Sequence, residues 1–293
     1  MKLHFDCAMG AAGDMITAAL YELLPDKAAF LTKFRTALAA CPALDGAEIL
    51  PEASVKCAIA GTHMRVTVRG EEEISDDVSG HAHTRAHAYT HIHSHARVHE
   101  RGGKNYSYTD ILALISGLAL SDKAKSDAKG VFALIARAEA KVHGLAPDAL
   151  SNVHFHELGS LDALIDVTAV CALMDELSVT EVTSSPVHVG AGAVRTAHGV
   201  LPVPTPATAE LLLGVPSYGG SIRGELCTPT GAALLRYFVS RFGEMSVTPL
   251  KIGYGMGSKD FDRCNCVRAF LCDDGASETD TICRLECNLD DMT

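Results

Sequence analysis

Residues 3–15 read LHFDCAMGAAGDM, and this opening stretch decides the class of fold that we expect. Leu3–Cys7 alternates apolar and polar side chains, which predicts a first β-strand. Gly10 and Gly13 then interrupt the chain, and Met15–Leu24 carries apolar residues at helical spacing until a proline ends the pattern. The order of strand, glycine-rich turn and helix is typical of an α/β protein.

Further periodic segments extend this pattern along the chain. Two extended runs, 47–60 and 63–69, predict a β-hairpin joined at Gly61. The other expected helices cover 26–40, 109–118, 122–143, 158–177, 207–213 and 230–242, and the other expected strands cover 181–189, 247–254, 265–272 and 281–287. A constrained loop rich in Gly and Pro is expected over 190–206. Together these elements predict a mixed α/β (α+β) fold with helices packed on a mixed sheet.

Composition and charge exclude several classes of function. The chain has 293 residues, 47% of them hydrophobic, which is enough to bury a core. With a formal net charge of −11, the chain is not attracted to the phosphate backbone of a nucleic acid, so we expect no nucleic-acid partner. No apolar run approaches the roughly 18 residues of a membrane span, and Asp6 interrupts any signal-peptide core. We therefore expect a cytoplasmic protein without a membrane partner.

Changes in composition divide the chain into four expected parts. The first, 1–69, holds the opening strand, its helix and the hairpin. The second, 70–104, is acidic and then rich in histidine, and its lack of hydrophobic periodicity predicts a long disordered insertion. A core α/β part covers 105–275, and 276–293 is interpreted as the start of a truncated C-terminal domain because it ends in a polar segment just after a predicted strand.

Half of the 14 histidines lie between residues 81 and 99. Imidazole nitrogens suit nickel, zinc and copper, and His-x-His spacing in a flexible loop allows several of them to wrap one ion. The candidate metal ligands in this histidine tract are His81, His83, His91, His93 and His95. Because a disordered tract supplies no fixed open coordination, it predicts metal storage or delivery rather than catalysis. The alternative is an incidental bias of composition.

A second cluster begins at residues 154–157, which read HFHE. Its two histidines point to the same side of an extended segment. The helix that follows carries aspartates at 162 and 166, which share one face at i and i+4. Two imidazoles beside carboxylates predict an open transition-metal site. The candidate metal ligands are His154, His156 and Asp162, and the candidate proton-accepting base is Glu157.

The glycine-rich turn after the first strand is a candidate ligand site. Amide groups at a helix N-terminus favour a phosphate or carboxylate, and the acidic residues beside them could instead hold Mg²⁺ or Mn²⁺. A purely structural turn explains the same residues equally well. The segment 228–231, which reads TPTG, places hydroxyl and amide groups before another helix in the same way. The candidate binding residues are Gly10, Gly13, Asp14, Thr228, Thr230 and Gly231, and Asp6 is a candidate catalytic residue.

Two further features bear on chemistry. His198 lies in the Gly- and Pro-rich loop and is a candidate catalytic residue because that constrained segment fixes it. His143 could join the metal cluster at 154–166, but alone it suits a cation at the C-terminal end of a helix. Six of the ten cysteines follow residue 220, and we interpret them as small buried residues, with a soft-metal site as the alternative.

In this order, the motifs resemble those of the LarC-type nickel insertion proteins. The resemblance is carried by 6–15, the histidine-rich insert, 154–162, Asp166, 198–204, 228–231, 253–257 and 288–293. It implies a nickel chelatase of the lyase class, which inserts Ni²⁺ into pyridinium-3,5-bisthiocarboxylic acid mononucleotide and consumes CTP. The implied product is the nickel-pincer cofactor of lactate racemase. The pair Ala11-Ala12 departs from the Ile-Ser that is usual in the family, at positions where the backbone matters most.

The resemblance also implies partners. In the family, a C-terminal domain associated with the nucleotide and with Mn²⁺ or Mg²⁺ follows the segment that matches 288–293. We therefore expect this chain to be the N-terminal part, to need that companion domain for activity, and to serve lactate racemase as the downstream recipient. The sequence leaves open whether the chain forms a homo-oligomer.

A non-catalytic nickel storage or delivery protein is the alternative function. It would depend entirely on the histidine tract, whereas an insertion enzyme would retain its chemistry in the ordered part. A hydrolase that uses His154 and His156 as metal ligands fits less well, because the later strand ends lack the single histidines expected of such a site.

Overall fold

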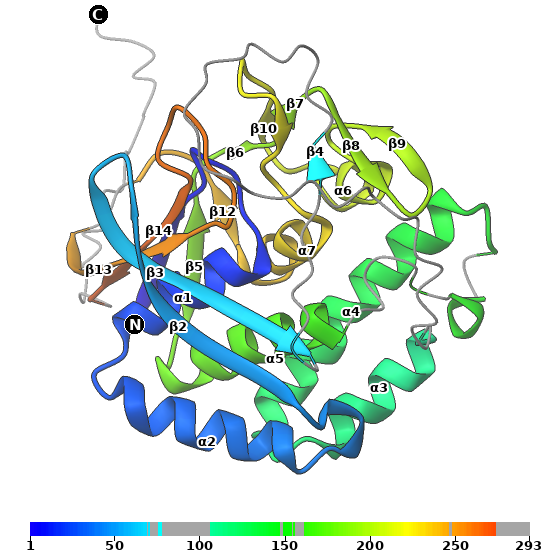
Figure 1. Cartoon of the computed structure of the whole chain (residues 1–293), viewed down its shortest axis with the longest axis horizontal. Coiled ribbons are helices and arrows are strands. Elements are labelled where there is room, and N and C mark those ends of the chain that lie inside the picture. The colour runs from blue at the N-terminus through cyan, green and yellow to red at the C-terminus, as the bar shows by residue number, and fades with distance from the viewer. Residues whose placement is uncertain are drawn as a thin grey trace, which may run out of the picture.

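The computed structural model describes residues 1–68, 70, 76–77, 106–146, 149–153, 155, 161–245 and 248–273. These residues form a large mixed sheet with helices packed against it, which confirms the expected α/β class (Figure 1). The predicted strand over 281–287, nearly all of 70–104 and the whole of 276–293 lie outside the described residues. The expected division of the chain into four parts therefore stays a prediction.

A seven-stranded sheet runs through the molecule in the order β12-β5-β1-β14-β13-β3-β2. Its strands are β1 (Lys2–Asp6), β2 (Ala47–Lys56), β3 (Ile59–Val68), β5 (Glu181–Ser184), β12 (Arg241–Phe242), β13 (Pro249–Met256) and β14 (Cys266–Cys272). β1, β5 and β12 are parallel, whereas β14 is antiparallel to both β1 and β13. Strands from the two ends of the described chain are thus neighbours in one sheet.

The helices form layers beside this sheet. They are α1 (Gly13–Leu23), α2 (Lys27–Ala39), α3 (Tyr108–Gly117), α4 (Asp122–Val142), α5 (Leu161–Glu176), α6 (Pro206–Leu211) and α7 (Pro229–Phe238), with short 3-10 turns at Pro42–Leu44 and Leu150–Asn152. α1 lies directly on the sheet, α5 packs on α1, and α4 and α3 follow further out (Figure 1). No helix in the described part of the chain is both long and apolar enough to cross a membrane.

The closest contact between a helix and the sheet is that of α1 with β13. Two glycines of β13 permit it, since a Cβ added to Gly255 would lie 1.8 Å from the Met15 carbonyl oxygen and one added to Gly253 would lie 2.0 Å from that of Ala19. The interface is filled by fully buried side chains of the sheet and of α1, including Leu3 and Leu20. This packing fixes where α1 begins relative to the strands.

Three helices begin at the same edge of the sheet. The chain runs from β1 into α1, from α5 into β5 and from α7 into β12, and these three strands are parallel. The N-termini of α1, α5 and α7 therefore lie at the carboxyl edge of the parallel strands. In α/β folds, ligands bind outside this edge.

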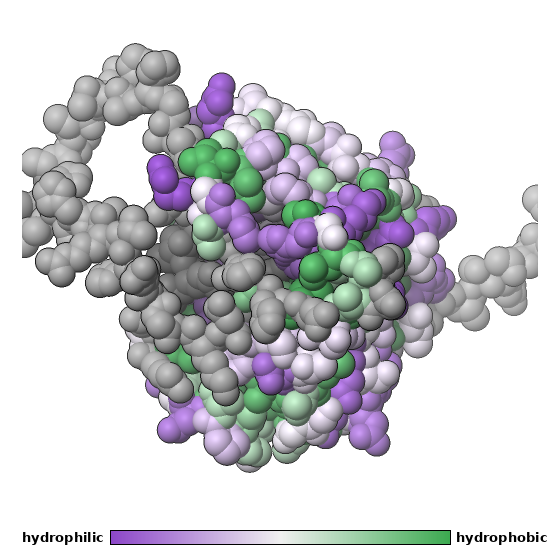
Figure 2. Space-filling model, turned by 90° about the vertical axis from the view of Figure 1, so that its right-hand side faces the viewer, coloured by the Kyte–Doolittle hydropathy of each residue, from purple (hydrophilic) through white to green (hydrophobic). Residues whose placement is uncertain are grey.

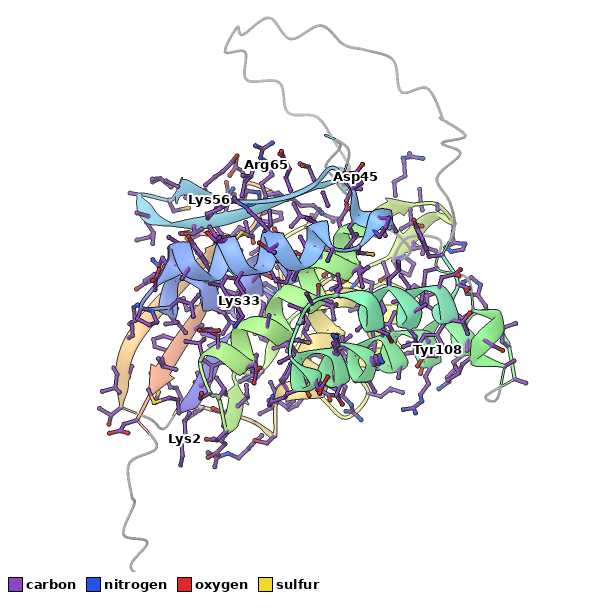
Figure 3. All side chains as sticks on the ribbon, turned by 90° about the horizontal axis from the view of Figure 1, so that it is seen from below. Lys2, Lys33, Asp45, Lys56, Arg65 and Tyr108 are labelled. Atoms are coloured by element: carbon purple, nitrogen blue, oxygen red, sulfur yellow. The ribbon has the colours of Figure 1, made fainter. Side chains whose placement is uncertain are left out.

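The hairpin of β2 and β3 lies alongside α2, as Figure 3 shows with Lys33, Lys56 and Arg65 labelled. The expected turn at Gly61 is wrong. The chain reverses at Cys57 and Ala58, whose φ angles are 50° and 62°. Gly61 lies inside β3, where an added Cβ would be 2.6 Å from the Met256 side chain, so close packing rather than the turn requires this glycine.

The segment expected as one strand over 181–189 is divided in two. β5 ends at Ser184, and β6 (Val187–His188) follows Pro186, which has no amide hydrogen to continue a ladder. β6 pairs with β10 (Ser217–Tyr218) in a small sheet of its own. The expected helix over 230–242 also ends early, because α7 stops at Phe238 and residues 241–242 join the main sheet as β12.

The region expected as a loop over 190–206 holds short strands. β8 (Ala193–Thr196) and β9 (Gly199–Pro202) form a hairpin, and β4 (Asp76–Asp77) pairs with β8. β7 (Gly190–Ala191) pairs with β11 (Gly224–Glu225). The Gly and Pro residues that predicted a loop lie at the turns and ends of these strands. The remaining expected helices and strands within the described residues are confirmed to within three residues at each end.

Candidate functional site

The glycine-rich turn and the TPTG segment meet in the structure. The Ala11 amide donates to the Leu226 carbonyl oxygen at 3.0 Å, and the Thr228 amide donates to that of Ala11, also at 3.0 Å. Thr228 in turn caps α7, because the Gly231 amide donates to its hydroxyl oxygen at 3.2 Å. Two motifs from opposite ends of the sequence are thus joined by backbone hydrogen bonds.

The glycines of these motifs allow the segments to approach. Gly10 has φ +85°, and an added Cβ would lie 2.0 Å from the Leu226 carbonyl oxygen. A Cβ on Gly231 would lie 2.1 Å from the Ala11 carbonyl oxygen, and one on Gly13 would lie 2.6 Å from Asp166 Oδ2. Each glycine therefore faces protein atoms, which gives all three a structural role. Their predicted role in binding a ligand is not tested by this geometry.

Three carboxylates gather where α1 and α5 begin. The negative charges of Asp14 and Asp162 both act on Asp166, and the burial of Asp166 adds the larger effect. As a result the pKa of Asp166 lies well above its ordinary value. Its Oδ1 atom is buried and has no hydrogen-bond partner among the described residues. The structure brings together aspartates that the sequence placed in two separate motifs.

His63 completes the polar surroundings of Asp14. Its Nδ1 donates to the Met256 carbonyl oxygen at 3.0 Å and lies 3.8 Å from Asp14 Oδ2. Both side chains are largely shielded, with 15% and 24% of their surface exposed. This contact could not be predicted from the sequence, because His63 lies in a β-hairpin with no other site residue near it in the chain.

Asp6 lies apart from these carboxylates. Its Oδ2 accepts from Arg268 Nε at 3.0 Å and from the same guanidinium through Nη2, and its Oδ1 accepts from the Ala8 amide at 3.0 Å. Asp6 and Arg268 are opposite each other on the neighbouring strands β1 and β14. Along each strand they alternate with the residues that face α1. Asp6 therefore points to the opposite face of the sheet from α1. The structure joins Asp14 to Asp162 and Asp166, and Asp6 to Arg268.

His198 lies in the turn of the β8–β9 hairpin. Its amide donates to Thr196 Oγ1 at 3.1 Å, and that hydroxyl donates to the Gly199 carbonyl oxygen at 3.1 Å, so the turn is well defined. The ring of His198 lies beside that of His143, with the two centroids 5.0 Å apart. His143 was expected either as an addition to the cluster at 154–166 or as a cation at a helix end, and the structure places the ring of His198 beside it.

Thr230 is buried in the first turn of α7. The other remaining candidate residues lie outside the described residues. They are His81, His83, His91, His93 and His95 of the tract, together with His154, His156 and Glu157. Phe155, between the two histidines, is described and fully buried, and its ring packs edge-on against that of Phe132 in α4 at 6.1 Å. Within the described ranges, no group of three His, Cys, Asp or Glu side chains is arranged to hold a metal ion.

The described cysteines are free thiols. Most are buried, and burial raises the pKa of Cys7 to about 12 and that of Cys227 well above its ordinary value. Such thiols pack as small apolar residues and are poor nucleophiles. Among the described cysteines after residue 220, this agrees with the interpretation as buried core residues for Cys227, Cys266 and Cys272, whereas Cys264 is partly exposed.

The class of the molecule follows from this geometry. It is a mixed α/β protein in which carboxylates, a histidine and the N-termini of three helices meet at the carboxyl edge of parallel strands, where α/β folds bind their ligands. The family model described as nickel insertion protein matches residues 3–293, and the chain belongs to this family. The resemblance drawn from the sequence motifs is thereby confirmed.

Relatives with curated names support the same assignment. The pyridinium-3,5-bisthiocarboxylic acid mononucleotide nickel insertion proteins of Acetivibrio thermocellus, Clostridium kluyveri and Staphylococcus epidermidis are 37%, 36% and 33% identical to this chain over 99% of its length. The chain spans 65%, 67% and 64% of the length of these relatives, in the same order. No solved structure matches the chain.

Proposed function

We propose that this chain takes part in inserting Ni²⁺ into pyridinium-3,5-bisthiocarboxylic acid mononucleotide, as the N-terminal part of a nickel chelatase of the lyase class. The observation that carries the proposal is the match to the nickel insertion family along residues 3–293. Relatives that are named for this substrate support it. The product would be the nickel-pincer cofactor of lactate racemase, in which two sulfurs and one carbon hold the metal.

Insertion sets a clear chemical requirement. Nickel must lose water ligands while it replaces a C–H proton of the pyridinium ring, so a base has to accept that proton. Glu157 is the proposed base. The residues proposed to present nickel are His154, His156, Asp162 and His198. Of these, Asp162 lies in the first turn of α5, beside the carboxylates of Asp14 and Asp166.

The carboxyl edge of the sheet supports a site for a ligand that carries both signs of charge. Asp14 and Asp162 attract the pyridinium ring and the metal ion. The phosphate of the mononucleotide would bind at the N-terminus of α1, which has no side-chain cap, whereas α7 is already capped by Thr228. The raised pKa of Asp166 reduces the negative charge that such a phosphate would meet.

CTP with Mn²⁺ or Mg²⁺ is the second part of the proposal. Following the resemblance to the family, we place the nucleotide and its cation in a C-terminal companion domain. The relatives are longer than this chain and provide length for such a domain.

A reconstitution experiment tests the proposal. The chain is supplied with substrate, Ni²⁺, CTP and Mn²⁺, with and without the C-terminal part of a relative, and the nickel-containing product is measured by mass spectrometry and by activation of lactate racemase. We expect product only with the companion part, and none with His154→Ala or Glu157→Ala. Lys33→Ala, a change to an exposed residue of α2, is the control. Unchanged product in both site variants would overturn the assignment of these residues.

Nickel storage or delivery without catalysis is the second candidate, and the seven histidines between 81 and 99 favour it. Replacing all seven by serine separates the two functions. An insertion enzyme keeps its activity when nickel is in excess, because the tract serves only as a reservoir. A storage protein loses its function in that variant at every nickel concentration.

A further inference from the structure

A pair of histidines outside the carboxyl edge of the sheet connects two elements that are distant in sequence. His143 is the C-cap residue of α4, and His198 lies in the turn between β8 and β9. Their ring centroids are 5.0 Å apart and the ring planes are inclined by 49°. The end of α4 and β9 lie close together at the right of Figure 1, on the side that faces the viewer in Figure 2.

Both histidines are held by the surrounding structure. The position of His198 is set by the hydrogen bonds of Thr196, which close the turn of the hairpin. On the other side, Glu139 Oε2 lies 3.3 Å from His143 Nε2, one helical turn earlier on α4. An ion pair of 2.9 Å between Lys141 and Glu210 joins the last turn of α4 to α6. The two rings are therefore held next to each other by two structural elements, the end of α4 and the turn between β8 and β9.

The spacing of the rings is that of two ligands on one metal ion. With a metal–nitrogen distance of about 2.1 Å, the ion lies about 3.2 Å from the centroid of each ring. Two rings bound at angles between about 90° and 110° then have centroids about 4.5–5.3 Å apart, and the observed separation is 5.0 Å. A carboxylate that holds the outer nitrogen of a ligating histidine, as Glu139 is placed to do, is a common supporting contact at metal sites.

The charge around the pair also suits a cation. Lys141 is the positively charged side chain on the same turn of α4, and its charge is compensated by Glu210. The whole chain has a formal net charge of −11. A divalent ion therefore meets no uncompensated positive charge from this turn of α4.

We propose that His143 and His198 form a two-nitrogen nickel site, with Glu139 orienting His143, from which the metal is passed on. Two protein ligands fit such a role, because the other coordination positions stay open to water and to an incoming ligand. This agrees with the finding that no group of three donors in the described part of the chain is arranged around a metal. The identity of the metal and its onward transfer rest on the proposed function, whereas the binding site itself does not.

Nickel binding by the full-length chain tests this site without any substrate. The histidine tract and the other proposed histidine ligands are first silenced by replacing His81, His83, His87, His91, His93, His95, His99, His154 and His156 with serine. Equilibrium dialysis and calorimetry with Ni²⁺ then compare this background with His143→Ala, His198→Ala and the double variant. We expect one nickel site to weaken at least tenfold in each single variant, and the double variant to be no weaker than the single ones, because the site needs both rings.

A matched control and a spectroscopic count make the test specific. Glu210→Gln breaks the neighbouring ion pair and keeps both imidazoles, so its nickel affinity should be unchanged. With Cu²⁺ as a probe, the electron paramagnetic resonance spectrum of the background should contain a site with two imidazole nitrogens, which each single variant reduces to one. Circular dichroism melts confirm that every variant is folded.

The result that overturns the site is plain. If both single variants bind nickel as tightly as the background, or if the two-nitrogen copper signal persists in them, the pair is not a metal site. The outcome is separate from that of the proposed function. Loss of the nickel site in a chain that never yields the nickel-containing product would support this inference and count against the insertion activity.

Discussion

Gly13 and Asp166 are in such close contact that no side chain fits between them: a Cβ on Gly13 would lie 2.6 Å from Asp166 Oδ2 and 2.8 Å from Asp166 Cβ. This contact joins the first turn of α1 to α5. It places a carboxylate beside the first turn of α1, in a buried position that disfavours its charged form. It also buries that carboxylate beside two others. Burial and the two neighbouring negative charges together raise the pKa of Asp166.

Replacement of Gly13 by alanine should destabilise the fold. The new methyl group meets Asp166 in a packed interface, so we expect a loss of about 1–3 kcal/mol in the free energy of unfolding, measured in urea. Gly117→Ala is the matched control, because Gly117 ends α3 and an added Cβ there has no atom within 4 Å. Equal stability of the two variants would mean that α1 and α5 are not in close contact in solution.

Asp166→Asn should stabilise the protein at neutral pH. The folded-state pKa of Asp166 is raised above its unfolded value, so the folded protein retains a proton that the unfolded chain releases as the pH rises. Stability due to this group is therefore lost between the unfolded pKa of about 3.9 and the higher folded pKa. The asparagine variant avoids this loss, and we expect a gain of about 1–3 kcal/mol near pH 7 that shrinks as the pH falls toward about 4.

Thermal unfolding across this pH range measures the effect. A gain of 1 kcal/mol corresponds to an increase in Tm of roughly 2–4 °C for a chain of this size. Asp162→Asn is the comparison, since Asp162 is one of the charges that raise the pKa of Asp166 and its removal should give a smaller gain of the same sign. A stability difference between wild type and Asp166→Asn that is independent of pH would contradict the raised pKa.

Local patterns were sufficient to predict much of the fold. The order of strand, glycine-rich turn and helix in 3–15 reflects interactions within one segment, and β1 and α1 appear where this pattern predicts them. The turn between β2 and β3 could not be predicted in this way. Gly61 carries the usual signal for a turn, but it serves a contact with β13, a strand nearly two hundred residues further along the chain.

The candidate site shows the same limit. Each motif was visible because its residues are close in sequence, as with the aspartates at 162 and 166. That Asp14 would join them, or that His63 would lie 3.8 Å from Asp14, depends on the packing of α1 between β13 and α5. Likewise, the predicted role of Asp6 rested on its nearness to Asp14 in the chain, and the alternation of side chains along β1 sends it to the other face of the sheet.

Thr228→Ala should cost about 1 kcal/mol of stability, because it removes the side-chain cap of α7. Thr228→Ser keeps a hydroxyl for the Gly231 amide and should retain most of that stability. The two variants also separate capping from substrate binding. If the hydroxyl contacts the mononucleotide in addition, Thr228→Ala lowers substrate affinity by more than its loss of stability explains, as measured by calorimetry at a temperature where both variants are folded.

The pairing of Asp6 with Arg268 gives a way to decide what Asp6 does. Asp6 was predicted as a catalytic residue, yet its carboxylate accepts two hydrogen bonds from the Arg268 guanidinium. We expect Asp6→Asn and Arg268→Gln each to lower stability modestly, by about 0.5–1.5 kcal/mol, because 48% of the arginine side chain is exposed to solvent that screens the pair. The double variant should be no less stable than the more damaged single variant, since the pair acts as one unit. Product formation in the reconstituted reaction then separates the two roles. A structural pair predicts equal activity for the two single variants, whereas a catalytic Asp6 predicts that only Asp6→Asn abolishes it.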